Sequence, residues 1–147
     1  MSDDALSEQF KALYTQWGDA IANKDHAYLE DLFTGDFLGT AQPWPSLIVN
    51  KAQMIELDKA IEAMETEWVK VTAHKVGAEV ITIGLVRYHK EEFRDGAAIA
   101  EGMPSGSDIA ALTHGKVAIY CNGWRHNGER WQIFDHHMVG LARDEGF

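Results

Sequence analysis

Residues 124–137, WRHNGERWQIFDHH, contain the local pattern that decides the fold. Asn127-Gly128 is a strong signal for a tight turn between antiparallel strands, because both residues tolerate the positive φ angles that such turns require. Aromatic and β-branched residues are frequent on both sides of this turn. The pattern predicts a β-hairpin with strands over about 109–125 and 131–141.

Two further strands are predicted upstream of this hairpin. Residues 66–89 are rich in Val, Ile, Thr, Trp and Tyr, a composition that favours strands, and Gly77 and Gly84 interrupt them. The sequence MPSGSD at 103–108 predicts a turn that joins a long bent strand, ending near Glu101, to the first strand of the hairpin. We expect a hairpin tip there rather than a phosphate-binding loop, because the lysine and following helix of such a loop are missing.

Three helices are predicted before the strands. Apolar residues at spacings of three and four mark the buried faces of the helices: Leu6, Phe10, Leu13, Tyr14, Trp17 and Ile21 in the first, Tyr28, Leu29, Leu32 and Phe33 in the second, and Met54, Leu57, Ile61 and Met64 in the third. Asp25 is placed to cap the second helix, and Asn50 with Gln53 resembles a capping box for the third. Pro43 and Pro45 predict an edge strand or a loop between the second and the third helix. The result is an α+β fold with one domain over residues 1–147.

The composition excludes several classes of partner. The chain has 147 residues and a net charge of −10, which argues against binding to nucleic acid or to an anionic membrane. No apolar stretch is long enough for a membrane span, and Met1 is followed by acidic residues rather than by a secretory signal. The single cysteine, Cys121, forms no disulfide within the chain, which favours a reducing compartment. We therefore expect a cytoplasmic protein.

The order of elements resembles the nuclear transport factor 2-like superfamily. The sequence features that carry the resemblance are NKD at 23–25, LFTGDF at 32–37, and the pair Trp124 and Trp131 followed by two histidines at 136–137. Ketosteroid isomerases, scytalone dehydratases, SnoaL-like polyketide cyclases and the association domain of calcium/calmodulin-dependent kinase belong to this superfamily. The resemblance implies a cystatin-like cone, in which a curved antiparallel sheet wraps around three helices from the N-terminal half. It also implies an interior pocket and a homodimer that forms through the outer face of the sheet.

The catalytic residues of ketosteroid isomerase are not retained. By the resemblance, the enolate-stabilising tyrosine of that family corresponds to Trp17, its general-base aspartate to Ala41, and its second oxyanion donor to Asn122. An indole N–H and an amide still donate hydrogen bonds, but no base remains at the second position. We therefore do not expect steroid isomerisation by that mechanism.

Similarity to the kinase association domain implies which side chains face the pocket. In that family, arginines of the last two strands face the pocket. The corresponding residues of this chain are Asn122 and Met138. Because side chains alternate along a strand, this alignment predicts that the pocket is faced by Tyr120, Asn122, Trp124, Gln132, Phe134, His136 and Met138. From the first helix, Tyr14 and Trp17 are expected to complete the walls. The outward set would be Trp131, Ile133, Asp135, His137 and Val139. A slip of one residue would exchange the sets and make Asp135 and His137 the pocket pair.

His136 is the candidate general acid or base, and Asn122 is a candidate amide donor to a developing oxyanion. For both residues the alternative is a structural role inside the core. The adjacent residues His136 and His137 point to opposite faces of a strand, so they cannot hold one metal ion together, and we predict neither a metal site nor a cofactor. Cys121 is expected to be an unreactive thiol, because Arg125 is its one nearby basic residue.

Three functions follow as hypotheses. The first is a homodimeric SnoaL-like protein whose interior pocket binds a small, mostly apolar molecule that is neutral or weakly polar. The second is a cofactor-free lyase, isomerase or cyclase with His136 as general base and Asn122 and Trp17 as hydrogen-bond donors. The third is an assembly or adaptor module that uses the outer face of the sheet. The sequence alone leaves the choice open, including whether the protein is an enzyme.

Overall fold

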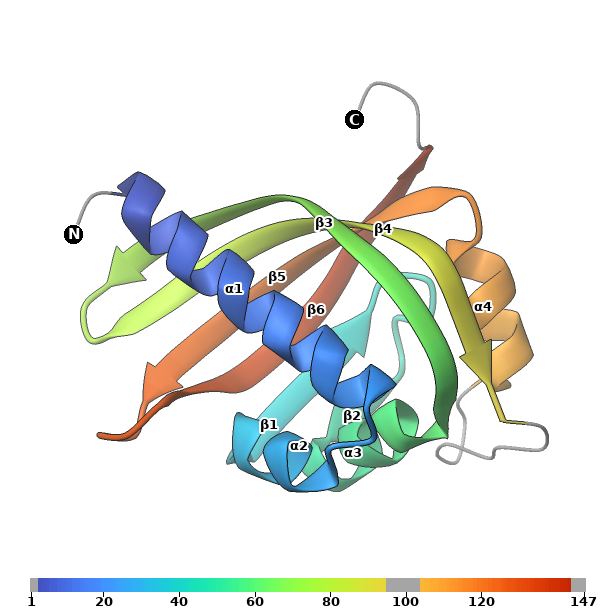
Figure 1. Ribbon diagram of the computed structural model, residues 1–147, viewed down its shortest axis with the longest axis horizontal. Helices are drawn as coiled ribbons and strands as arrows, with labels where there is room; N and C mark the ends of the chain where they lie inside the picture. The colour runs from blue at the N-terminus through green and yellow to red at the C-terminus, as the bar shows by residue number, and fades with distance from the viewer. Residues whose placement is uncertain (1–2, 95–103, 144–147) are drawn as a thin grey trace.

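The computed structural model describes residues 3–94 and 104–143, which form four helices and a curved, unclosed sheet of six strands (Figure 1). The helices are α1 (Asp3–Ala22), α2 (His26–Leu32), α3 (Lys51–Ala60) and α4 (Gly106–Thr113). The strands are β1 (Phe33–Ala41), β2 (Ile48–Asn50), β3 (Ile61–Val76), β4 (Glu79–Phe93), β5 (Lys116–His126) and β6 (Trp131–Arg143). This architecture confirms the α+β class.

The sheet has the order β2-β1-β6-β5-β4-β3. Helix α1 covers one face of the sheet and makes its most extensive contacts with β3 (Figure 1). β1 is parallel to β6 and every other neighbouring pair is antiparallel, so the sheet is mixed at one place. β1 is an interior strand that continues as far as Ala41, so the loop or edge strand predicted around the prolines begins only after this residue. Pro43 and Pro45 lie in the turn before the short edge strand β2, in agreement with the predicted loop or edge strand, and no ladder hydrogen bond is lost there.

The starts of two helices follow the local signals in the sequence. The Asp25 side chain accepts a hydrogen bond from the Tyr28 backbone N–H at the start of α2. Asn50 and Gln53 form the predicted reciprocal capping box of α3, with N···O distances of 2.9 and 2.8 Å. These bonds satisfy backbone donors that have no partner inside a helix, which explains why α3 begins at Lys51.

The end of α3 differs from the prediction. The helix stops at Ala60, and Ile61 and Met64 belong to β3, where they pair with Phe93 and Glu91 of β4. Their helical spacing from Met54 and Leu57 is equally compatible with burial from a strand. Cross-strand pairing along almost the whole length of β4 therefore decides their conformation.

The fourth helix was not predicted. Residues 106–113 were expected to contain a turn and the start of a strand, but Ser105 caps a helix by accepting a hydrogen bond from the Asp108 N–H. β5 consequently begins only at Lys116. β4 ends at Phe93, and the predicted extension of this strand to Glu101 lies outside the described residues, as do Gly102 and Met103.

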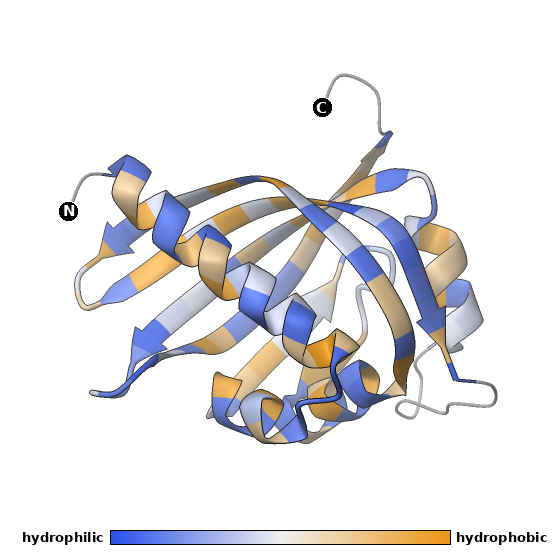
Figure 2. Cartoon of the chain, in the orientation of Figure 1, coloured by the Kyte–Doolittle hydropathy of each residue, from blue (hydrophilic) through white to orange (hydrophobic). Residues whose placement is uncertain are grey.

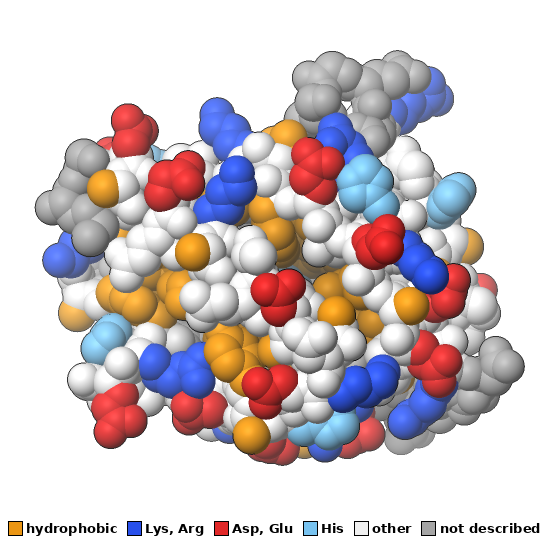
Figure 3. Space-filling model, viewed as in Figure 1, with side chains coloured by type: hydrophobic (Ala, Val, Ile, Leu, Met, Phe, Trp, Pro, Cys, Tyr) orange, Lys and Arg blue, Asp and Glu red, His pale blue; other side chains and the backbone are white. Residues whose placement is uncertain are grey.

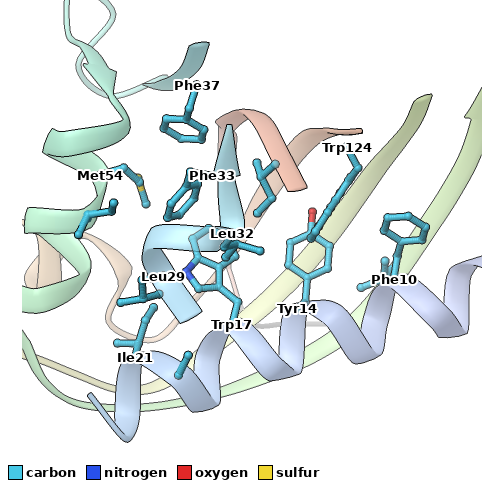
Figure 4. Close-up of a cluster of buried hydrophobic side chains, with 14 of the residues drawn as sticks. Phe10, Tyr14, Trp17, Ile21, Leu29, Leu32, Phe33, Phe37, Met54 and Trp124 are labelled. Atoms are coloured by element: carbon cyan, nitrogen blue, oxygen red, sulfur yellow. The ribbon is translucent and has the colours of Figure 1, made fainter. Parts of the chain in front are cut away.

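The core lies between α1 and the sheet. Phe10, Tyr14 and Trp17 leave α1 on one side and point toward Phe33 and Trp124 (Figure 4). The buried Trp124 ring meets Phe10 and Tyr14 edge to face, at centroid distances of 5.1 and 5.5 Å. Hydropathy alternates along much of the strands and along the helix faces (Figure 2), as a sheet with one buried face requires.

Three polar side chains inside this core are paired with one another. The Trp124 indole N–H donates to Thr82 Oγ1 over 2.9 Å, and the Tyr14 hydroxyl lies 2.7 Å from the same oxygen. Burial raises the pKa of Tyr14, so its hydroxyl keeps its proton. No described helix is both long enough and apolar enough to cross a membrane.

Candidate functional site

An interior cavity of about 140 Å³ lies between α1, α3, α4 and the concave face of the sheet. Its walls combine aromatic side chains from α1, the strands and the turn before β2 with aliphatic side chains from α3, β2, β3 and β4. The aromatic walls are Tyr14, Trp17, Trp44, Trp68, Tyr88, Phe93 and Tyr120. Seen from the α1 side in Figure 3, hydrophobic side chains show between the charged side chains of this face. Aromatic and aliphatic side chains thus make up most of the cavity walls.

Five of the predicted pocket residues line this cavity: Tyr14, Trp17, Tyr120, His136 and Met138. Asn122 is buried behind them and contacts His136 rather than the cavity. Ala41, the position that corresponds to the isomerase base, also lines the cavity and brings no polar group.

The prediction that Phe134 faces the cavity is wrong. Its ring lies on the other side of β6, with the Arg125 guanidinium 4.1 Å above it. The cause is a β-bulge: Gly123 pairs with Asp135 while Trp124 pairs with Ile133, which leaves Phe134 as an extra residue.

This bulge reverses the alternation of side chains in the first part of β6. Ile133 is fully buried in the core, and Trp131 packs edge to face on Phe10, so neither faces outward as predicted. Beyond the bulge the alternation agrees with the alignment, because His136 and Met138 line the cavity. Asp135 and His137 lie on the opposite face, where His137 contacts Thr40 and Asp135. The exchanged arrangement with Asp135 and His137 in the pocket is therefore not adopted.

His136 is held by three groups. Its ring stacks on Tyr120 at 4.6 Å and meets the edge of Trp17 at 5.0 Å, and its Nδ1 lies 2.7 Å from Asn122 Oδ1. With the amide in this orientation the carbonyl oxygen accepts, so Nδ1 carries the proton and Nε2 has the free lone pair. Desolvation, with a smaller contribution from His137, lowers the pKa of His136 to about 3. The imidazole is therefore neutral at physiological pH.

Asp58 brings a carboxyl group to the cavity from the last turn of α3. Its side chain is 3% exposed, and its Oδ2 accepts a hydrogen bond from the Trp17 indole N–H over 3.0 Å. Burial raises the pKa of Asp58 to about 7, against the opposing effect of the Trp17 hydrogen bond. The group can therefore gain or lose a proton near neutral pH.

A second acid, Glu91 of β4, lines the same cavity. Its Oε1 lies 3.2 Å from the hydroxyl of Thr113, which the unpredicted helix α4 supplies. Desolvation raises the pKa of Glu91 to about 7, and the charge of Glu91 in turn raises the pKa of Asp58. The cavity therefore contains two ionisable acids in addition to the residues named from the sequence.

Sequence reasoning missed both acids for different reasons. Asp58 follows Met54 by four residues and so shares the buried face of the helix, which was an available signal. Glu91 stands in the charged run KEE at 90–92, which is typical of a solvated strand end and carries no such signal. Within residues 3–94 and 104–143, no group of three His, Cys, Asp or Glu side chains could hold a metal ion.

Comparisons with known proteins show the fold of this chain. No protein-family model matches it, and no curated protein matches it by sequence. Its structure is similar to an NTF2-like protein from Cytophaga hutchinsonii, with a TM-score of 0.63 at 17% identity over 97% of this chain and 99% of that chain. It is also similar to the association domain of C. elegans CaMKII, with a TM-score of 0.63 at 10% identity over 95% of this chain and 97% of that chain.

A third similar structure is a protein from Streptomyces avermitilis described as a candidate dehydratase of the NTF2-like family. The TM-score is 0.61 at 13% identity, over 92% of this chain and 96% of that chain. These likenesses confirm the nuclear transport factor 2-like fold that the sequence resembles. At such low identity they show the fold alone, and the same fold serves different functions.

Proposed function

We propose that this protein with a nuclear transport factor 2-like fold is SnoaL-like and binds a small, mostly apolar molecule in its interior cavity. The observation that carries the proposal is the cavity itself, about 140 Å³ in volume with predominantly aromatic and aliphatic walls. An engineered protein cavity of about 150 Å³ holds benzene. The ligand, or the part of it that enters, is accordingly about the size of one six-membered ring.

Few polar groups orient this ligand. Tyr14, Trp17, Tyr120 and Met138 supply contact area, while the neutral His136 offers Nε2 as an acceptor. Asn122 acts through His136, because its hydrogen bond fixes the ring that the ligand would touch. Phe134 has no part in this site, since it lies on the other face of β6.

Calorimetry with benzyl alcohol tests the proposal. Wild type is expected to bind this probe, and Ala41→Phe is expected to lose binding, because the added ring occupies cavity space beside Tyr120 and Met138. Ala12→Phe, on the exposed side of α1, is the matched control and is expected to bind normally. Absence of binding by wild type, or undiminished binding by Ala41→Phe, would contradict the proposal.

A second candidate function is a cofactor-free lyase or isomerase, which the Asp58 carboxyl favours. A group with a pKa near 7 is suited to proton transfer at neutral pH, whereas His136, with a pKa near 3, is a weak base. The geometry thus favours Asp58 over His136 as general base and leaves His136 to donate or accept one hydrogen bond. Exchange of α-hydrogens of phenylacetone for solvent deuterium, followed by NMR, tests this function.

In that experiment Asp58→Asn is expected to abolish exchange, because an amide takes up no proton at neutral pH. His136→Gln is expected to keep part of it, since glutamine still hydrogen-bonds. Loss of exchange only in His136→Gln would return the role of general base to His136. No exchange by wild type would remove this second function for carbonyl substrates of this size.

We further propose a homodimer through the outer face of the sheet. Ile81, Ile83 and Val139 are 40%, 48% and 51% exposed there, in strands that neighbour each other through β5. Cys121 lies between Ile83 and His137 in the same cross-strand row. Such an exposed apolar face is suited to covering by a second copy or by another protein, which is the assembly or adaptor hypothesis.

A further inference from the structure

All charged side chains that line the cavity, within the described part of the chain, are acidic. Asp58 and Glu91 contribute carboxyl groups, and neither a lysine nor an arginine is present in the walls. Lys24 lies outside these walls and donates to the backbone oxygen of Ile61. His136 is neutral, and burial raises the pKa of Tyr88 and Tyr120, so these groups bring no charge. An anionic ligand would thus meet only acidic groups.

The two carboxyl groups have fewer hydrogen-bond donors than they can use. Asp58 Oδ2 accepts from the Trp17 indole N–H, and this is the one hydrogen bond of the Asp58 carboxyl group within the described residues. Glu91 has a single partner in the described chain, the hydroxyl of Thr113. This hydroxyl also lies 3.2 Å from the Ala110 carbonyl oxygen and 3.5 Å from that of Ile109, so its one proton is shared among three acceptors. The two carboxyl groups could therefore accept further hydrogen bonds from donors inside the cavity.

We propose that the ligand of this cavity is a small primary amine, whose ammonium group binds between Asp58 and Glu91 while its apolar part lies against the aromatic walls. This inference rests on the proposed binding function and names the chemical class of its ligand. An ammonium group has three N–H donors and no acceptor, which matches two carboxyl groups short of donors. A neutral alcohol of the same shape supplies one donor and no charge.

The aromatic walls support the same ligand class. Trp17, Trp44, Trp68 and Tyr88 line the cavity together with the two acids. Aromatic faces attract a cation through their quadrupole, and more strongly where water is excluded. The bound cation would also stabilise the ionised carboxylates, whose charges otherwise oppose each other across the cavity.

Calorimetric titration with benzylamine and benzyl alcohol tests the inference, because the two probes share a ring and differ in the amine. At about pH 8 both carboxyl groups are ionised and an alkylamine is still mostly protonated, by comparison with lysine. Wild type is expected to bind the amine at least about tenfold more tightly than the alcohol. At about pH 5.5 the carboxyl groups are protonated, and this preference is expected to shrink.

Two variants connect the preference to the acids. Asp58→Asn is expected to remove the preference for benzylamine over benzyl alcohol, and Glu91→Gln is expected to reduce this preference. Glu92→Gln, at the exposed neighbouring position, is the control and is expected to behave as wild type. Equal affinity for amine and alcohol in wild type would overturn the inference and leave the proposed function intact. Binding of neither probe would overturn both.

Discussion

At the scale of single residues, Asp58 dominates the chemistry of the cavity. Its pKa rises from 3.8 to about 7, so between these values the folded chain holds a proton that the unfolded chain has released. The stabilising effect of this proton is complete below about pH 4 and is lost as the pH rises through 7. Ionised Asp58 therefore lowers the free energy of unfolding at alkaline pH.

Asp58→Asn is expected to be more stable than wild type at about pH 8, by a few kcal/mol, at about 1.4 kcal/mol per pKa unit. The amide oxygen still accepts from the Trp17 N–H, and no charge is buried. At about pH 4 the two proteins are expected to be similar, since Asp58 is then protonated in wild type as well. Urea unfolding at both pH values measures the difference in stability. Asp19→Asn, at an exposed position of α1, is the control. A variant that is less stable at both pH values would contradict the prediction.

The pKa shift of His136 has the opposite sign to that of Asp58. Its pKa falls from 6.5 to about 3, so the unfolded chain binds the extra proton, and the stability that it contributes is lost as the pH falls from about 6.5 to 3. In mildly acidic solution the acids and His136 thus have opposite effects on the pH dependence of the free energy of unfolding. The pH profile of wild type alone therefore reports only their sum.

Asn122 is the residue that keeps His136 in place, and Asn122→Ala tests this. We expect a loss of about 1–3 kcal/mol in the free energy of unfolding, because the buried Nδ1–H of His136 would have no acceptor. Affinity for benzyl alcohol should also fall, since the ring that lines the cavity is no longer fixed. Guanidinium unfolding and calorimetry measure the two effects. Gln16→Ala, exposed on α1, should change neither.

At the scale of elements, two β-bulges determine which side chains of β6 reach the cavity. The ladder with β5 shifts between Gly123 and Trp124 and again between Ile119 and Tyr120. Between the bulges His136 and Met138 face the cavity, whereas before the first bulge Ile133 faces the core. One strand therefore serves both the packing core and the site.

The contact between β4 and Trp68 of β3 also shapes the cavity. Gly84 leaves room for the Trp68 ring, and a Cβ atom there would lie 2.7 Å from Trp68 Cζ3. The ring packs against Tyr14 with a centroid distance of 4.1 Å, so it cannot move away freely. The small residue on β4 thus fixes one aromatic wall.

Gly84→Ala is expected to lower the free energy of unfolding by about 1–3 kcal/mol, the usual range for overpacking. Displacement of Trp68 should also weaken benzyl alcohol binding and change tryptophan fluorescence. Gly35→Ala is the matched control, because a Cβ atom there meets nothing within 4 Å. Equal behaviour of the two variants would show that Trp68 moves without cost.

At the scale of the whole molecule, the two faces of the sheet have different roles. The concave face carries the cavity and α1, whereas the outer face exposes Ile81, Ile83 and Val139. Burial and Asp135 raise the pKa of Cys121 on the outer face, which keeps this thiol in its unreactive form. The outer face is therefore suited to contacts rather than to thiol chemistry.

Ile83→Lys is expected to convert the proposed dimer to a monomer, because it replaces apolar contact area with a charge facing its own copy. Size-exclusion chromatography with light scattering measures the mass. Val76→Lys, an equally exposed position at the end of β3, is expected to remain dimeric. Benzyl alcohol binding should be unaffected in both, since neither residue lines the cavity. A monomeric wild type would contradict the proposed dimer.

The sequence predicted those features that depend on neighbouring residues. The Asp25 cap, the Asn50 and Gln53 capping box and the turn at Gly128 are formed by hydrogen bonds or by a positive φ angle within a few residues. Local signals of this kind are complete in a short stretch of sequence. They suffice for the order of most elements, and this order resembles the superfamily whose fold the chain adopts.

Features that depend on distant segments were decided by tertiary structure. The bulge at Phe134 is set by pairing with β5. Residues 106–113 form the helix α4, although a stretch of this composition is also compatible with the start of a strand. Asp58 and Glu91 meet because α3 and β4 border the same cavity, 33 positions apart in sequence numbering. Their shifted pKa values arise from desolvation, which no local pattern encodes. The sequence by itself thus determined the fold, and packing alone decided that this apolar cavity contains two acids.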